Sequence, residues 1–147
     1  MRIDKEAIAG LIPHAGAMCL LDEVTSWDAA RIRCVSRTHW AALNPLRSQG
    51  RVPALCGIEY AAQAMAAHGG LAGAISTRPR AGYLVSVREV ICRAAWLDDF
   101  EGDLVIDAER LAGDAERVMY RFTLSVGDSE VLSGRATVVL DAAAGVA

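Results

Sequence analysis

Residues 53–70 read Pro53-Ala-Leu-Cys-Gly-Ile-Glu-Tyr-Ala-Ala-Gln-Ala-Met-Ala-Ala-His-Gly-Gly70, and this stretch decides the fold. Pro53 suits the start of a helix, where its missing N–H is not needed, and the two glycines at 69–70 mark the end. Apolar residues recur at helical spacing between these points. The many alanines and glycines let a neighbouring backbone approach closely, so we expect a helix over residues 55–74 that a sheet encloses.

Glu59 is the one acidic residue in this stretch, and Gln63 lies four residues later on the same helix face. The simplest interpretation of Glu59 is a carboxylate that complements the helix dipole near its N-terminus. A membrane-spanning helix is disfavoured, because Glu59, Gln63 and His68 would each lie in hydrocarbon. The choice between a structural and a chemical role for Glu59 depends on the rest of the chain.

The length and composition of the chain exclude several classes of protein. Its 147 residues fit one domain, residues 1–147, and the formal net charge of -3 with 53% hydrophobic residues argues against disorder and against a nucleic-acid partner. The four cysteines have no zinc-binding spacing, so we expect reduced core thiols and no metal. No Gly-rich phosphate loop precedes a helix, and we expect no cofactor. Alternating charges at the N-terminus break a signal-peptide pattern, so a cytoplasmic location is the default expectation.

Strand-like segments flank the central helix on both sides. Before it, residues 4–11 predict a short helix capped by Asp4, and residues 41–52 predict a loop. Alternation of apolar and polar residues predicts strands at 19–27, 30–40, 83–93, 104–111, 117–126 and 130–140. This order favours an α+β hot-dog fold, in which a curved antiparallel sheet of five to seven strands wraps the long central helix. The alternative is an α+β sandwich with the helix lying flat on one face of the sheet.

Three segments in the correct order resemble the 3-hydroxyacyl-acyl-carrier-protein dehydratase family, and together they span nearly the whole chain. Residues 12–24, Ile12-Pro-His14-Ala-Gly-Ala-Met18-Cys-Leu-Leu21-Asp-Glu-Val24, resemble the family's opening Leu-Pro-His run and the Leu-Leu-Val-Asp-Arg-Val that follows it. Pro53, Glu59 and Gln63 have the spacing of the family's Pro-Gly-Val through Glu-Ala-Met-Ala-Gln segment. Residues 83–90 and 103–106 are similar to its third strand and the segment after it. The Ile-Glu acid and the altered loop resemble the subgroup associated with aryl polyene assembly.

The resemblance implies a hot-dog dimer with an acyl-pantetheine tunnel between protomers, acting on acyl-carrier-protein or coenzyme A thioesters in fatty acid or polyene-type biosynthesis. Glu59 matches the catalytic acid of this family. A helix-end N–H, from Gly57 or a neighbour, would steady the enolate-like oxygen. We expect Gly57, Gln63, Asn44 and Pro53 to bind substrate, and bulky substitutions at Gly57 or Ala62 to block the site with little loss of fold.

The histidine of the family's catalytic dyad is missing from its usual position. The family pattern places it about fourteen residues before the acid, at Pro45, beside Asn44. For His39 we expect an exposed position at a strand end, and for His68 a polar role at the helix end. His14 matches a family histidine outside the dyad, and we expect it to tie a turn to a backbone carbonyl.

Three functions therefore stay open at this point. The chain is a dehydratase with a rearranged dyad, a hot-dog thioesterase that works from Glu59 alone, or a non-catalytic subunit paired with an active relative as a heterodimer. A thioesterase needs only a carboxylate, a polarising N–H and water, so the missing histidine weighs least against it.

Arginines accompany the predicted first hairpin and the central helix, and two roles are open to them. They form solvated surface, or they recognise an acidic carrier protein or the phosphate of a pantetheine arm. The positions concerned are Arg31, Arg33, Arg37, Arg47, Arg51, Arg78 and Arg80.

Overall fold

A computed structural model describes residues 2–12, 16–72, 81–114 and 116–141. The helices are α1 (Lys5–Ala9) and α2 (Gly57–Ala72), with four short 3-10 turns, η1 (Gly16–Met18), η2 (Thr38–Trp40), η3 (Ala54–Cys56) and η4 (Leu97–Asp99). The strands are β1 (Ile3–Asp4), β2 (Glu23–Trp27), β3 (Arg31–Ser36), β4 (Ala81–Cys92), β5 (Leu104–Gly113), β6 (Arg117–Val126) and β7 (Ser129–Asp141). In this part of the chain, no helix is long and apolar enough to cross a membrane.

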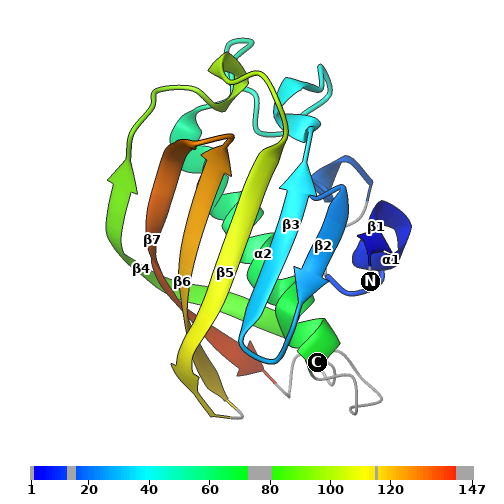
Figure 1. Cartoon of the computed structure of the whole chain (residues 1–147), viewed down its shortest axis with the longest axis vertical. Coiled ribbons are helices and arrows are strands. Elements are labelled where there is room, and N and C mark those ends of the chain that lie inside the picture. Colours follow the sequence, from blue (N-terminus) through cyan, green and yellow to red (C-terminus); the bar gives the residue numbers. More distant parts are fainter. Residues whose placement is uncertain (1, 13–15, 73–80, 115, 142–147) are drawn as a thin grey trace.

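The described strands form one antiparallel sheet in the order β1-β2-β3-β5-β6-β7-β4. The strand that follows α2 in the sequence, β4, therefore lies at the edge of the sheet, where it pairs only with β7. The sheet curves around α2, which lies along its concave face (Figure 1). The hot-dog prediction is confirmed, and the flat sandwich is excluded.

Small residues allow α2 to lie close to the sheet. Ala61, Ala64 and Ala67 are fully buried along one side of the helix. At Gly57, the first residue of α2, an added Cβ would lie 2.8 Å from Cδ2 of Leu124 and 2.8 Å from Cδ2 of Leu132. The predicted enclosed helix is correct, although residues 54–56 form a tighter 3-10 turn ahead of it.

The segment before β2 departs from the strand expected over residues 19–27. Leu20 does not join the ladder, because its N–H donates to the Gln63 side chain at 2.8 Å and its carbonyl accepts from the Ser36 hydroxyl at 2.6 Å. Strand β2 consequently begins at Glu23. The sequence also did not reveal β1, which pairs Ile3 with Val24 directly before the predicted Asp4 cap.

His68 joins the C-terminal half of α2 to two parts of the sheet. Its Nε2 donates to the carbonyl of Asp28 in the β2–β3 turn at 2.8 Å, and its Nδ1 accepts from the Tyr120 hydroxyl at 2.7 Å. Burial is the main cause that holds the pKa of His68 below its ordinary value, so the ring is neutral. Burial also raises the pKa of Tyr120 to about 12, which keeps its hydroxyl proton in place as the donor. The polar role expected for His68 near the helix end thus consists of these two hydrogen bonds.

Substitution of Gly57 should destabilise the fold. Gly57→Val should lower the free energy of unfolding by roughly 1–3 kcal/mol, because the new side chain must displace two leucines that are fully buried. Gly69→Val in the same helix is the control, since a Cβ there meets nothing within 4 Å. Urea unfolding followed by circular dichroism measures both, and equal effects at the two glycines would contradict the close approach.

Acid should weaken the fold through His68. The folded state resists protonating this ring, whereas the unfolded chain takes up a proton near pH 6.5. The stabilisation is therefore complete above about pH 6.5 and is lost as pH falls below it toward the depressed pKa of the folded state. His68→Gln should flatten the pH dependence of unfolding between about pH 7 and 5. If the free energy of unfolding of His68→Gln depends on pH as steeply as that of the wild type, the His68 contacts do not cause this dependence.

Candidate functional site

The first turn of α2 carries the predicted catalytic carboxylate. Glu59 is exposed, whereas its neighbour Tyr60 and most of the helix are buried. Cys56 lies just before this turn, and burial followed by the negative charge of Glu59 raises the pKa of its thiol. Glu59 is thus a solvent-accessible carboxylate at the N-terminal end of an enclosed helix, which is where the helix dipole stabilises negative charge.

The backbone N–H groups at the start of α2, which were expected to face substrate, donate to carbonyls of the preceding turn instead. The Gly57 N–H donates to the carbonyl of Ala54, and the Cys56 N–H donates to the carbonyl of Pro53 at 3.0 Å. Pro53 itself is half-buried and forms an isolated bridge with Trp96. These groups shape the turn that holds Glu59. The geometry argues against the expectation that bulky residues at Gly57 leave the fold intact, because a side chain there would point into the core.

Asn44 is buried and fastens the loop before α2. Its Nδ2 donates to the Thr38 carbonyl at 2.8 Å and to the Tyr60 hydroxyl at 3.0 Å, and its Oδ1 accepts from the Leu46 N–H at 2.8 Å. The Tyr60 hydroxyl can then donate to the Thr38 hydroxyl at 2.9 Å, which in turn donates to the Leu20 carbonyl at 2.8 Å. Every polar atom of the Asn44 side chain is engaged inside the protein, so the structure gives it a positioning role.

Gln63 is also buried, and it points to a different part of the chain from Glu59. Its Oε1 accepts from the Leu20 N–H at 2.8 Å, and its Nε2 donates to the Met18 carbonyl at 2.5 Å. The amide therefore holds the segment before β2 against α2. The four-residue spacing placed Gln63 and Glu59 on neighbouring positions of the helix, but the segment before β2 holds Gln63 inside the protein while Glu59 is exposed.

His39 does not occupy the exposed strand end that was expected. It is fully buried in η2, beside Trp40, and its Nε2 lies 3.3 Å from the Phe100 carbonyl. Among the described residues its Nδ1 has no hydrogen-bond partner. Burial is the first cause that lowers the pKa of His39, so the ring is neutral. The contact with Phe100 and the complete burial of the ring leave it without access to solvent.

The buried hydroxyl chain of Tyr60, Thr38 and Ser36 was missed at the sequence level. Tyr60 is a large polar aromatic between small residues of the enclosed helix, and a buried tyrosine hydroxyl needs a partner. That requirement was the available signal, although it does not identify which loop supplies the partner. Burial is the main cause that raises the pKa of Tyr60, which keeps it a proton donor.

Most arginines named from the sequence form ion pairs with acids of the same chain. The pairs are Arg31–Glu109 at 3.0 Å, Arg33–Asp107 at 2.7 Å, Arg37–Asp103 at 3.0 Å, Arg47–Asp98 at 3.7 Å, and Arg51 with Asp98 at 2.8 Å and with Asp99. The surface interpretation of these five arginines is therefore the better one. Arg78, Arg80 and His14 lie outside the described residues.

The cysteines fit the expected free thiols only in part. Cys19 and Cys34 are buried, Cys56 is half-buried, and Cys92 is exposed, so the core expectation is wrong for Cys92. No group of three histidine, cysteine or acidic side chains within the described ranges has the arrangement of a metal site. The chemistry open to the site is that of a single accessible carboxylate, with the described histidines engaged in holding the fold.

Comparison with known proteins agrees with this architecture. A structure of the dehydratase heterocomplex ApeI:P from Xenorhabdus doucetiae has 23% sequence identity, covers 91% of this chain and 90% of its own, and superposes with a TM-score of 0.80. Zebrafish thioesterase superfamily member 2 has 15% identity, covers 93% and 95%, and has a TM-score of 0.62. A hypothetical thioesterase with coenzyme A from Streptococcus pneumoniae has 10% identity, covers 80% and 84%, and has a TM-score of 0.59.

These structural likenesses show a shared hot-dog fold. Comparison with curated protein sequences gives no match. The profile of the ApeP-like family, described as ApeP dehydratase, matches residues 6–144, which is nearly the whole chain. The chain belongs to the ApeP-like dehydratase family.

Proposed function

We propose that this chain is a dehydratase subunit that acts on 3-hydroxyacyl thioesters in fatty acid or polyene-type biosynthesis, with Glu59 as its catalytic carboxylate. The observation that carries the proposal is the exposure of Glu59 at the first turn of a helix that the sheet otherwise encloses. Membership of the ApeP-like family supports this reaction class. The thioester is carried by acyl carrier protein or coenzyme A, and the protein works in the cytoplasm.

Dehydration of a 3-hydroxyacyl thioester needs two proton transfers. A base removes the proton α to the thioester carbonyl, and an acid protonates the 3-hydroxyl as the C–O bond breaks, which releases water and leaves the trans-2-enoyl thioester. Glu59 supplies one of these groups. His39 is buried with Nε2 against the Phe100 carbonyl, and His68 is held by Asp28 and Tyr120. Because both described histidines are held by the fold, we propose that a partner subunit supplies the second group.

The geometry of the sheet edge supports such a partner. Strand β4 has no strand on its outer side among the described residues, and its Val85 and Ile91 are 55% and 48% exposed. The turn that precedes Glu59 lies beside the segment that follows β4, since the Ala54 N–H donates to the Ala95 carbonyl at 2.9 Å. A strand that adds to β4 would bring its own connected loops near the same end of α2. The structurally similar ApeI:P is itself a dehydratase heterocomplex, and a heterodimer with a related hot-dog chain is the assembly we favour over a homodimer.

A thioesterase is the second candidate, for a specific reason. With both described histidines held by the fold, Glu59 acting with water is the simplest chemistry open to the isolated chain. The reaction would add water to the thioester carbonyl and release a carboxylic acid and a free thiol. The two candidates therefore differ in product.

Glu59→Gln should abolish turnover and leave the fold intact, because the amide has nearly the same shape but does not exchange a proton usefully. The expected loss of 3-hydroxyacyl dehydration is about 10²- to 10⁴-fold. Glu116→Gln, at an exposed glutamate of the β5–β6 hairpin, is the matched control. The assay follows enoyl absorbance and free thiol together, for the chain alone and with its related hot-dog partner.

Each outcome of this assay separates the candidates. Enoyl formation that depends on Glu59 supports the dehydratase, and thiol release that depends on Glu59 supports the thioesterase. Activity of the mixture that is the same with wild type and Glu59→Gln would mean that Glu59 only complements the helix dipole and that the chain is a non-catalytic partner.

The edge of β4 should be the assembly surface. Light scattering at micromolar concentration should give the mass of a dimer, either for the chain alone or with its related partner. Val85→Lys should shift the equilibrium toward monomer, because a charge on an edge strand opposes pairing. Ala112→Lys is the control, since Ala112 is exposed on β5, which β6 and β7 separate from β4. A dimer that tolerates Val85→Lys but not Ala112→Lys would place the interface elsewhere.

A further inference from the structure

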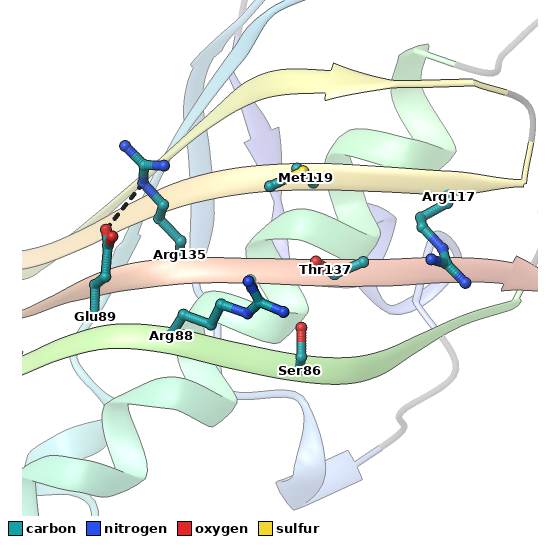
Figure 2. Close-up of a pocket in the computed structure, with 8 residues that line it drawn as sticks. Ser86, Arg88, Glu89, Arg117, Met119, Arg135 and Thr137 are labelled. Atoms are coloured by element: carbon teal, nitrogen blue, oxygen red, sulfur yellow. Dashed lines mark ion pairs between the residues drawn. The ribbon is translucent and has the colours of Figure 1, made fainter.

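A basic hollow lies on the face of the sheet that points away from α2. It has a volume of about 280 Å³, and its walls are formed by Arg88, Arg117 and Arg135 with the acidic Glu89. Figure 2 shows these side chains rising from β4, β6 and β7, with α2 behind the sheet. The hollow therefore does not share the face on which Glu59 and the central helix lie.

Two of the three arginines of this hollow carry no partner of opposite charge within the described part of the chain. Arg135 pairs with Glu89 at 3.1 Å, whereas Arg88 and Arg117 form no ion pair with any described residue. The hollow thus gathers three guanidinium groups against one carboxylate, on a chain whose net charge is -3. Three positive charges around one hollow repel one another, and a bound anion would relieve that repulsion.

A second hollow on the same face serves as an internal comparison. Its lining contains Arg31, Arg33 and Arg121 together with Asp28, Asp107 and Glu109, so three cations meet three acids. Two of these arginines are in ion pairs of 3.0 and 2.7 Å. The outer face is therefore not basic throughout, and of these two hollows only the one lined by β4, β6 and β7 has an excess of positive charge.

The local backbone concentrates the charge in this place. Strand β4 carries an extra residue between Arg88 and Ile91 relative to β7, and Glu89 has a left-handed φ of 54°. Such a bulge interrupts the alternation of side chains, and both Arg88 and Glu89 line the hollow. Arg88 from β4 and Arg117 from β6 extend over β7 toward Thr137 (Figure 2).

We propose that this hollow binds the diphosphate group of a small molecule. Arginine matches phosphate oxygens with paired N–H donors, and the hydroxyls of Ser86 and Thr137 add two further donors. The Met119 side chain is 38% exposed and forms an apolar wall for the organic part of such a ligand. The hollow is near the lower end of the size range of ligand pockets, which suits a diphosphate better than the convex surface of a protein.

The site is compatible with the proposed assembly and does not depend on it. Pairing at the β4 edge uses backbone groups in the plane of the sheet, so the side chains on the outer face stay open. Glu89 restrains Arg135 in the free protein. Removal of the Glu89 charge should therefore strengthen anion binding. A variant that merely unfolds the protein would weaken anion binding, so the two effects have opposite signs.

Calorimetric titration with inorganic pyrophosphate tests the proposal. We expect saturable binding at one site per chain, weakened about tenfold or more by Arg88→Gln or Arg117→Gln. Arg33→Gln, in the balanced hollow of the same face, should leave the affinity unchanged. Glu89→Gln should tighten binding several-fold, and Glu130→Gln, which removes an exposed carboxylate paired with Arg93, should not.

A comparison of ADP with pyrophosphate distinguishes the two possible sources of the diphosphate. Tighter binding of ADP than of pyrophosphate would indicate a nucleotide, and the reverse order would indicate a free diphosphate. The proposal fails if pyrophosphate does not saturate, or if Arg33→Gln weakens binding as much as Arg117→Gln. It also fails if Arg117→Gln changes only the oligomeric state, because the basic surface would then pack against a second copy of the chain.

Discussion

The close contact between Gly57 and the leucines of β6 and β7 is the constraint on which the rest of the structure depends. A sheet can curve tightly around a helix only if the helix presents little side-chain volume where the two meet, and the buried alanines along α2 continue that condition. The same packing fixes the direction of the first turn. Glu59, two residues after Gly57, faces out of the enclosure as a consequence of what its neighbours bury.

Long-range polar contacts explain where prediction from the sequence succeeded and where it did not. The enclosed helix and the antiparallel sheet follow from local spacing, and both were predicted. The start of β2 was not, because Gln63 satisfies the backbone of Leu20 from 43 residues away. Periodicity describes which side chains share a face, but it carries no information about the segment that will lie opposite them.

The candidate site shows the same division between local and distant information. Glu59 could be named from its isolation among small residues. Asn44 and Gln63 were expected to meet substrate, and the structure uses them to fasten two segments onto α2. An amide at position 44, hydrogen-bonded to Tyr60, holds the loop close to where the family resemblance expects its histidine. The Asn44 contacts hold this loop through a neutral side-chain amide, with no histidine at the position where the resemblance expects one.

The two bulges of β4 have a consequence for the protein before it meets a partner. One extra residue interrupts the register between Leu84 and Ser86, and another between Arg88 and Ile91. A long exposed edge strand is ordinarily a template for uncontrolled stacking of chains, and irregular spacing of its backbone groups removes that template. The irregular backbone of β4 therefore blunts this edge of the sheet against unspecific pairing between chains.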